Sequence, residues 1–185
     1  MPGLPASGGR AHPLGRLHAP EARRQRQADH LWLYSGAEVI SFFVPGRPQA
    51  QGSKVRTKWG ALKEDNDELG PWRERVALAA YEAVANGPPW WKKEDTGTVP
   101  APLVEGPIAV GLEFVLYRPQ ATPQSRTPPA TKKPDIDKMT RAILDALTHV
   151  LWTDDSQVTV LLARKRVANR GEGPGVHVWV SESSS

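Results

Sequence analysis

The chain has 185 residues, a length typical of one domain with tails, and it carries a formal net charge of +4 with a pI near 9.5. It contains no cysteine, which excludes disulfide bonds and thiolate metal sites, and its five histidines lack the spacing of a zinc site. No apolar run approaches the ~20 residues that a membrane-spanning helix needs, so no membrane association is expected. The positive net charge is compatible with a polyanionic partner but does not identify one.

Residues 1–37 are rich in glycine, proline, alanine and arginine, and they show no apolar periodicity before Leu31. This composition predicts a disordered basic N-terminal arm. The arm either adds contacts to DNA or is a solvated tail, for instance one produced by a translation start assigned too early, and the second interpretation is favoured. The folded domain is expected over residues 38–182, and residues 183–185 are expected to form a frayed tail.

A first strand is predicted over residues 38–45, where a Pro-Gly pair signals a turn. The loop that follows, residues 47–60, carries Lys54 and Arg56 near glycine and serine, a composition that suits contacts to phosphate. An ordinary polar hairpin explains the same residues equally well. Lys54 and Arg56 are therefore candidate DNA-binding residues with a structural alternative.

A helix is predicted over residues 71–85, because proline stands at its start, Gly87 follows its end and apolar side chains share one face. A strand is predicted over residues 108–116, where apolar residues alternate with others. Glu113 points away from the apolar face of this strand and could approach a metal site, although an exposed strand glutamate is the commoner case. The connection between these elements, rich in proline and tryptophan, is expected to pack onto the domain rather than to stack on bases.

A basic loop, residues 118–133, comes next, and it contains no acidic residue. Its cations are Arg118, Arg126, Lys132 and Lys133. Cations beside a candidate metal site would attract a phosphodiester backbone, so Lys132 and Lys133, which are nearest to that site, are the favoured DNA-binding residues. A solvated linker is the alternative.

The stretch of residues 134–158 carries four aspartates at the two ends of one predicted helix. Apolar residues recur between them at three- and four-residue steps, which is the pattern of an amphipathic helix extending to about residue 151. So many carboxylates are costly together unless a cation lies among them, and Mg²⁺ prefers carboxylate oxygens and water. A helix cap explains Asp135 alone but not Asp137, Asp154 and Asp155, so we expect the carboxylates to converge on a divalent metal.

Two further strands are predicted, over residues 157–167 and 176–180, with a glycine-rich turn between them. His177 in the last strand is expected to be structural. The order strand, helix, strand, helix, strand, strand predicts a single α+β domain. In it, a mixed sheet of about four strands is covered on one face by two main helices.

Several short motifs occur together in this chain and resemble those of the RusA family of Holliday junction resolvases. They are Asp135-Ile136-Asp137, Asp145-Ala146-Leu147, Trp152-Thr153-Asp154-Asp155-Ser156-Gln157-Val158 and, more loosely, the strand and loop of residues 40–54. The resemblance covers about residues 39–182. It implies a crossover junction endodeoxyribonuclease with Mg²⁺, or alternatively Mn²⁺, as cofactor. The implied enzyme acts as a homodimer on branched DNA in recombination and repair, in the cytoplasm of a bacterial or phage-infected cell.

By position, the resemblance implies that Asp135, Asp137 and Asp155 bind the metal and carry catalysis. The family usually has asparagine where this chain has Lys138, and lysine where it has Arg141. Arginine keeps the charge and grips phosphate but does not readily exchange a proton, so Arg141 is expected to stabilise charge in the reaction. Lys138 would either strengthen DNA contact or weaken metal binding.

Two neighbouring aspartates have less definite expected roles. Asp154 is expected to orient a metal ligand, and Asp145 could pair with Arg141 on the same helix face. Two other functions stay open: a junction-binding protein whose catalysis has lapsed, and a metal-dependent phosphohydrolase acting on nucleotides.

Overall fold

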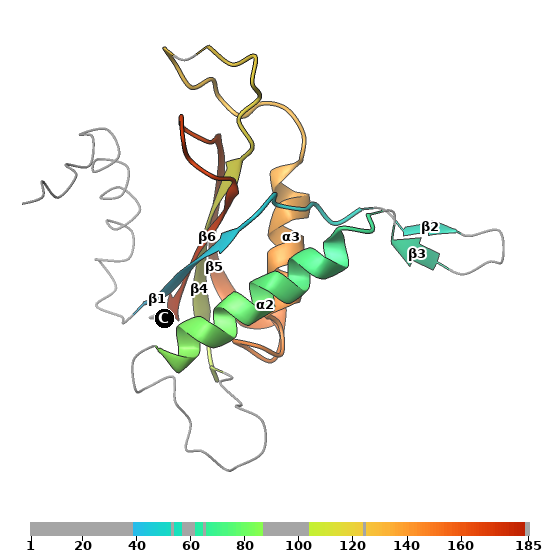
Figure 1. Cartoon of the computed structure of the whole chain (residues 1–185). Helices are drawn as coiled ribbons and strands as arrows, with labels where there is room; N and C mark the ends of the chain where they lie inside the picture. The colour runs from blue at the N-terminus through green and yellow to red at the C-terminus, as the bar shows by residue number, and fades with distance from the viewer. Residues whose placement is uncertain are drawn as a thin grey trace, which may run out of the picture. The chain divides into compact units, whose positions relative to one another are not determined.

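The structure is a computed structural model that describes residues 39–52, 54–56, 62–64, 66–86, 104–123 and 125–183 (Figure 1). These residues belong to one compact unit, Ala37–Ser185. The predicted basic arm and the tryptophan-rich connection lie outside the described residues. No helix within the described ranges is long and apolar enough to cross a membrane.

The described elements form a four-stranded mixed sheet, a separate two-stranded hairpin and two helices. In chain order they are β1 (Ile40–Pro45), β2 (Lys54–Arg56), β3 (Leu62–Glu64), α2 (Leu69–Ala85), β4 (Ile108–Leu116), α3 (Ile136–Leu147), a 3-10 turn (Asp155–Gln157), β5 (Val158–Val167) and β6 (Gly175–Glu182). The main sheet has the order β1-β6-β4-β5, in which β4 and β5 are parallel and the other pairs are antiparallel. The predicted α+β class is confirmed.

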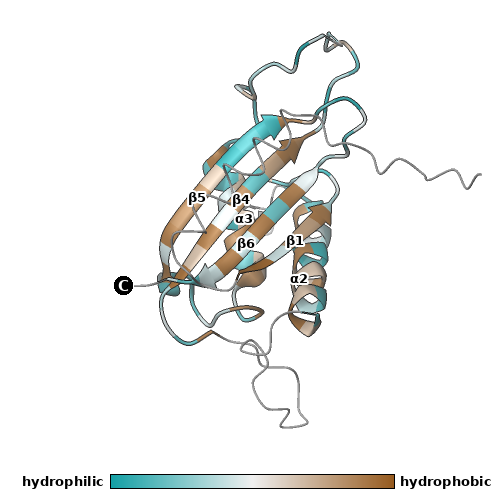
Figure 2. Cartoon of the chain, turned by 90° about the vertical axis from the view of Figure 1, so that its left-hand side faces the viewer, coloured by the Kyte–Doolittle hydropathy of each residue, from teal (hydrophilic) through white to brown (hydrophobic). Residues whose placement is uncertain are grey.

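Both helices lie on one face of the main sheet, as Figure 1 shows in profile and Figure 2 shows from the opposite face. The core lies between these two layers. α3 contributes the buried side chains Met139, Ile143 and Leu147, which recur every four residues. β4 has a neighbouring strand on each side, and all its residues from Ile108 to Val115 are buried.

Two helix boundaries differ from the predictions for local reasons. α3 ends at Leu147 rather than near residue 151, because Thr148 adopts an extended backbone and His149 has a positive φ of 64°. The Thr148 hydroxyl donates a hydrogen bond back to the last turn of α3, which satisfies a carbonyl there. α2 begins at Leu69, so that Pro71 stands within its first turn, where a missing backbone N–H costs nothing.

We predict that Ile143→Ala lowers the free energy of unfolding by about 2–5 kcal/mol, because Ile143 is fully buried between α3 and the sheet and truncation leaves a cavity. Leu78→Ala on α2 is the matched control, since Leu78 is 59% exposed and should cost about 0.5 kcal/mol or less. Urea unfolding of both variants measures the difference. Equal losses would contradict the assignment of the core.

Candidate functional site

The N-terminus of α3 carries two carboxylates that are not bonded to the rest of the described structure. Asp135 occupies the N-cap position, but its side chain makes no capping hydrogen bond, so the capping explanation of this residue is not supported. Asp137 follows in the first turn, and both residues are exposed. Neither carboxylate makes a hydrogen bond or ion pair with the described residues. The helix dipole favours negative charge at this end.

Lys165 of β5 fixes the chain just before these two aspartates. Its ammonium donates hydrogen bonds to the carbonyl oxygens of Lys132, at 3.0 Å, and Pro134, at 2.8 Å. The end of β5 therefore lies beside the start of α3. No role for Lys165 was predicted from the sequence. The alternation along β5 could have indicated it, because Lys165 lies between Ala163 and Val167 on the side of the strand that faces the helices.

Asp155 is held in place at the other end of α3. Its Oδ1 accepts a hydrogen bond from the indole N–H of Trp152, at 2.9 Å, and another from the hydroxyl of Thr148, the residue that caps α3. Trp152 is fully buried, so the indole is a rigid donor. Oδ2 of Asp155 accepts no hydrogen bond from the described residues. Trp152 and Thr148 thus orient Asp155, a role that the sequence analysis missed.

Gln157 secures the turn that carries Asp155. Its side-chain oxygen accepts hydrogen bonds from the backbone N–H groups of Thr153 and Asp154. Its side-chain amide donates to the carbonyl oxygens of Val104 and Gly106. These contacts explain why glutamine follows the two aspartates in the motif: it ties the turn to the segment before β4.

Asp154 caps the 3-10 turn by accepting a hydrogen bond from the backbone N–H of Ser156. Hydrogen bonds from Ser156 hold the pKa of Asp154 below its usual value. The contact of Asp154 lies within its own turn, so the structure gives no support for an orienting role toward Asp135 or Asp137.

The structure does not bring Asp155 to the other two aspartates of the same chain. α3 has 12 residues, which is about 18 Å at 1.5 Å per residue, and Asp155 is bonded at its far end. Within the described ranges, no three metal-ligating side chains form a group that could hold an ion. The expectation that Asp135, Asp137 and Asp155 converge within one chain is therefore wrong. A straight helix keeps its two ends apart.

Asp145 forms an ion pair with Arg73 of α2, not with Arg141 as the sequence suggested. Lys138 and Arg141 both have exposed side chains on α3. The backbone carbonyl of Lys138 accepts a hydrogen bond of 3.0 Å from the N–H of Gln51. The loop after β1 is thereby joined to the first turn of α3. The side chains of the predicted DNA-binding residues in β2, further along that loop, lie outside the described parts.

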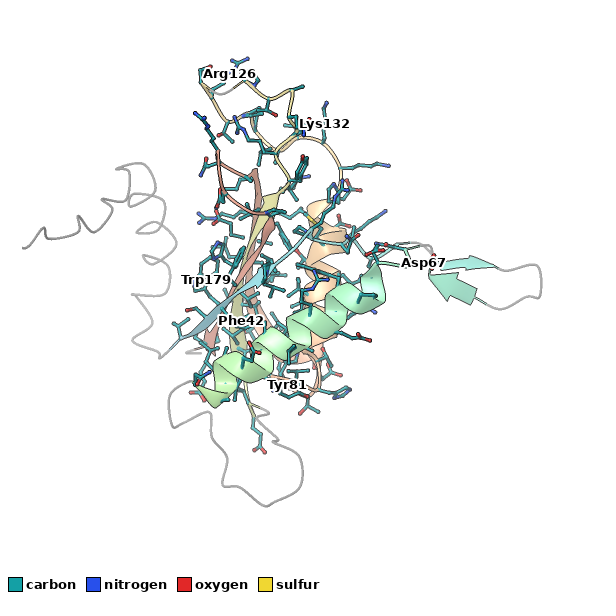
Figure 3. The ribbon with its side chains drawn as sticks, in the orientation of Figure 1. Phe42, Asp67, Tyr81, Arg126, Lys132 and Trp179 are labelled. Carbon is teal, nitrogen blue, oxygen red and sulfur yellow. The ribbon has the colours of Figure 1, made fainter. Side chains whose placement is uncertain are left out.

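The basic loop is held by Arg118, whose guanidinium donates to the carbonyl oxygens of Pro123, Arg126 and Ala168 and to the Thr127 hydroxyl. Arg118 is therefore a structural clamp, in agreement with its lower rank as a DNA contact. Lys132 and Lys133 have exposed side chains. Figure 3 shows Lys132 on the part of the loop that descends to α3, with Arg126 farther away.

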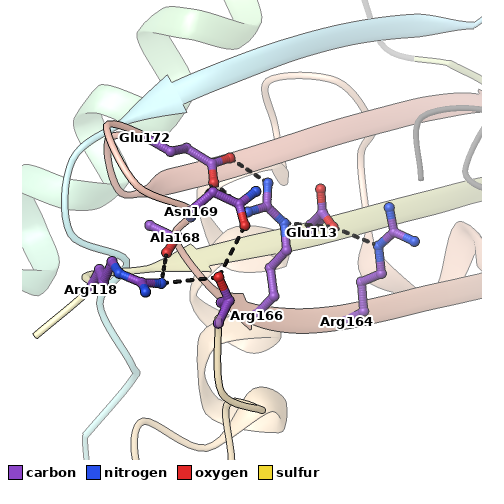
Figure 4. A network of polar contacts seen from close by, with 8 residues as sticks. Glu113, Arg118, Arg164, Arg166, Ala168, Asn169 and Glu172 are labelled. Atoms are coloured by element: carbon purple, nitrogen blue, oxygen red, sulfur yellow. Dashed lines mark hydrogen bonds and ion pairs between the residues drawn. The ribbon is translucent and has the colours of Figure 1, made fainter. Parts of the chain in front are cut away.

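Glu113 lies on the sheet face opposite the helices, which excludes the metal-site role considered for it. It is buried and forms ion pairs with Arg164, at 2.9 Å, and Arg166, at 3.1 Å, both on β5 (Figure 4). Arg166 also pairs with Glu172 in the turn before β6. The hydrogen bond to Glu172 raises the pKa of Arg166 above its usual value, and burial opposes that shift. This network joins β4, β5 and the turn before β6.

His177 lies on the same sheet face, next to this network. Its ring lies 4.5 Å from that of Phe43 and 5.7 Å from that of Trp179, measured between centroids. Burial lowers the pKa of His177. These contacts agree with the structural role expected for it.

A family model described as Endodeoxyribonuclease RusA matches residues 45–181, which include α3 with Asp135 and Asp137, and the turn with Asp154 and Asp155. The chain belongs to the RusA endodeoxyribonuclease family. It is also 28% identical, over 160 residues, to the uncharacterized protein YqaN of Bacillus subtilis (strain 168); the match covers 80% of this chain and 99% of YqaN. RusA-family nucleases bind branched DNA and generally depend on a divalent metal.

The residues at the start of α3 fit such a metal. Asp135 and Asp137 supply exposed, uncommitted carboxylate oxygens two residues apart. Mg²⁺ is usually held by one or two carboxylates together with substrate phosphates and water. The chemistry of the pair is therefore compatible with an ion that is also bound by DNA phosphate and water.

If Asp155 is a metal ligand, we predict that Trp152→Phe slows DNA cleavage by about 10-fold or more, because removing a group that orients a ligand typically costs 10–100-fold. Folding stability should fall in this variant and in the control below, since each leaves a cavity, and by about 1 kcal/mol more in Trp152→Phe for the lost hydrogen bond. Trp72→Phe is the matched control, because Trp72 is equally buried but its indole N–H has no described partner. Single-turnover cleavage and urea unfolding separate the two effects. Equal slowing in both variants would contradict a specific role for the Trp152 indole.

Proposed function

We propose that this protein is a Mg²⁺-dependent endonuclease that resolves four-way DNA junctions by paired hydrolytic nicks. It acts as a homodimer, in recombination and repair, in the cytoplasm of a bacterial or phage-infected cell. The observation that carries the proposal is the uncommitted pair Asp135 and Asp137 at the start of α3, inside a RusA-family match and directly after a basic loop. Residues 1–37 are proposed to be an arm outside the nuclease domain.

The side chains around α3 have different proposed roles in phosphodiester hydrolysis. Lys132 and Lys133, with Lys138 on α3, attract the DNA backbone to the carboxylates. Lys54 and Arg56 in β2 are proposed to extend this basic surface. The two aspartates hold the divalent metal, which supplies Lewis-acid activation of the phosphate and a water of lowered pKa when bound.

Arg141 lies one helical turn after Asp137, on the same side of α3. From there its guanidinium can donate two hydrogen bonds to the phosphate and stabilise the charge that develops on it. Because arginine stays protonated, this role requires no proton transfer. The family's usual lysine would offer the same charge with one donor group.

Asp155 belongs to the site only if a second copy of the chain supplies it. We propose that each site combines Asp135 and Asp137 of one protomer with the partner's Asp155. The free Oδ2 of a carboxylate that Trp152 and Thr148 hold rigid supports this proposal. A two-fold dimer then has two identical sites, which suits symmetric nicking of a four-way junction.

We predict that Asp137→Asn lowers cleavage by at least about 100-fold, since losing the metal removes several kcal/mol of transition-state stabilisation. Junction binding should persist or tighten, because a negative charge facing DNA is removed. The measurement compares a labelled four-way junction with linear duplex, with Mg²⁺, Mn²⁺ or a chelator. Asp145→Asn on the same helix is the control.

Full cleavage by Asp137→Asn at ordinary Mg²⁺ would refute the assignment. Junction binding without cleavage by the unaltered protein at any metal concentration would favour the lapsed junction-binding protein. Hydrolysis of nucleotides in preference to junctions would favour the phosphohydrolase.

Mixing two inactive variants tests the shared site. In a heterodimer, one site combines the Asp137→Asn substitution of one chain with the Asp155→Asn substitution of the other. The second site then contains only unaltered aspartates. Random subunit exchange should restore about a quarter of wild-type nicking per chain, as single nicks rather than paired ones. No recovery, with exchange verified by mass, would contradict a site shared between two chains.

A further inference from the structure

The ammonium of Lys165, on β5, is bonded to the segment that carries the two free aspartates of α3. It donates hydrogen bonds to the carbonyl oxygens of Lys132, at 3.0 Å, and Pro134, at 2.8 Å. The second of these carbonyls belongs to the peptide group that leads into Asp135. Lys165 therefore holds the backbone from which the first carboxylate projects, and it leaves the oxygens of both Asp135 and Asp137 unbonded.

A backbone hydrogen bond holds the other end of the same segment. The carbonyl oxygen of Lys138, in the first turn of α3, accepts a bond of 3.0 Å from the N–H of Gln51. Residues 135 and 137 thus lie between two points at which the chain is bonded to other parts of the fold. Of these two contacts, that of Lys165 comes from a side chain, so a substitution can remove it.

Lys165 occupies a place in β5 where an apolar residue would be expected. It is paired with Phe114 of β4, which is fully buried, and it lies on the side of the strand that faces the helices. The aliphatic part of a lysine can cover apolar neighbours while its ammonium reaches polar groups beyond them. Because a half-buried ammonium is costly unless its donors are bonded, the two carbonyl oxygens account for a charge at this position.

We propose that Lys165 is a positioning residue for the divalent metal. It holds the backbone before Asp135, so that this carboxylate and that of Asp137 keep the spacing that an ion requires. It does so through carbonyl oxygens, so that no carboxylate oxygen is withdrawn from the metal. This inference rests on the proposed function for the identity of the metal ligands. Groups that orient metal ligands typically contribute about 10–100-fold to metal affinity or activity, and a loss of that size is expected when Lys165 is removed.

The sign of the effect separates positioning from the charge of Lys165 alone. A fixed positive charge near a metal site repels a cation, so removal of the charge without a change in geometry should tighten metal binding. Removal of the hydrogen bonds should weaken binding, because the carboxylates lose their fixed spacing. A role in folding stability alone should leave the metal affinity of the folded protein unchanged. The three roles therefore predict three different results.

The Mg²⁺ dependence of single-turnover junction cleavage measures the apparent metal affinity. Lys165→Met keeps the length of the side chain without its donors or charge, and it should raise the Mg²⁺ concentration for half-maximal rate by about 10-fold or more. Junction binding in the presence of a chelator should change little. Lys165→Arg keeps the charge and the donors and should recover most of the affinity. An unchanged or lower Mg²⁺ requirement in Lys165→Met would overturn the positioning role.

Arg164→Met is the matched control for this titration. Arg164 is the preceding residue of β5, and its substitution removes the same charge, but its side chain pairs with Glu113 on the opposite face of the sheet. Its Mg²⁺ dependence should equal that of the unaltered protein. An equal rise in the Mg²⁺ requirement of Arg164→Met and Lys165→Met would contradict a specific role for Lys165.

Amide hydrogen exchange tests the same contact without metal or DNA. The N–H of Met139 donates to the carbonyl oxygen of Asp135, at 3.2 Å, so its exchange reports on the first turn of α3. Lys165→Met should speed the exchange of this amide several-fold, while the amide of Ile143 in the middle of α3 keeps its protection. Unchanged exchange at Met139, or an equal change at both amides, would overturn the inference. The expected local change in a protein that cleaves no junction with any metal would instead contradict the proposed function and leave Lys165 as a backbone anchor.

Discussion

The length and burial of α3 constrain everything else in this domain. Its apolar face, with Ile143 and Leu147, is packed between α2 and the sheet, so the helix is fixed as a straight rod. Carboxylates stand at both ends of that rod, and no local rearrangement can bring them together. Asp135 and Asp137 therefore lie at one end of α3, and Asp155 lies at the other. In the proposed dimer, two copies related by a two-fold axis would remove this separation without changing either chain.

The carboxylates at the two ends of α3 are bonded to their surroundings in different ways. At the start, Lys165 fixes the chain before Asp135 through backbone carbonyls and leaves the carboxylates free. At the far end, side chains bond directly to Asp155, and Gln157 ties the turn beneath it. One end is open to ligands from solution, and the other holds a carboxylate in one orientation. This asymmetry fits a site assembled from two surfaces. One surface would bind the ligand from solution, and the other would add a fixed carboxylate to the site.

The sequence was sufficient for the fold class and for the main elements, because strand alternation and the four-residue step of α3 are strong local signals. The hydrogen bonds that place Lys165, Trp152 and Gln157 were not accessible in the same way, since each depends on which strands become neighbours. Convergence of the aspartates within one chain is not observed, for a related reason. Composition shows that carboxylates need a cation, but it does not show whether one chain or two surround it. In the sequence, the apolar residues of β5 have the pattern of a buried strand. Their exposure becomes evident only from the order of the strands, which places β5 at the edge of the sheet.

The measurement that tests this account most directly is anomalous diffraction from crystals of the protein grown with Mn²⁺. The account predicts an ion bound by Asp135 and Asp137 of one protomer and by the partner's Asp155. An ion held by Asp135 and Asp137 with both copies of Asp155 remote from it would contradict the shared site. An ion bound by other side chains altogether would contradict the nuclease assignment of these aspartates.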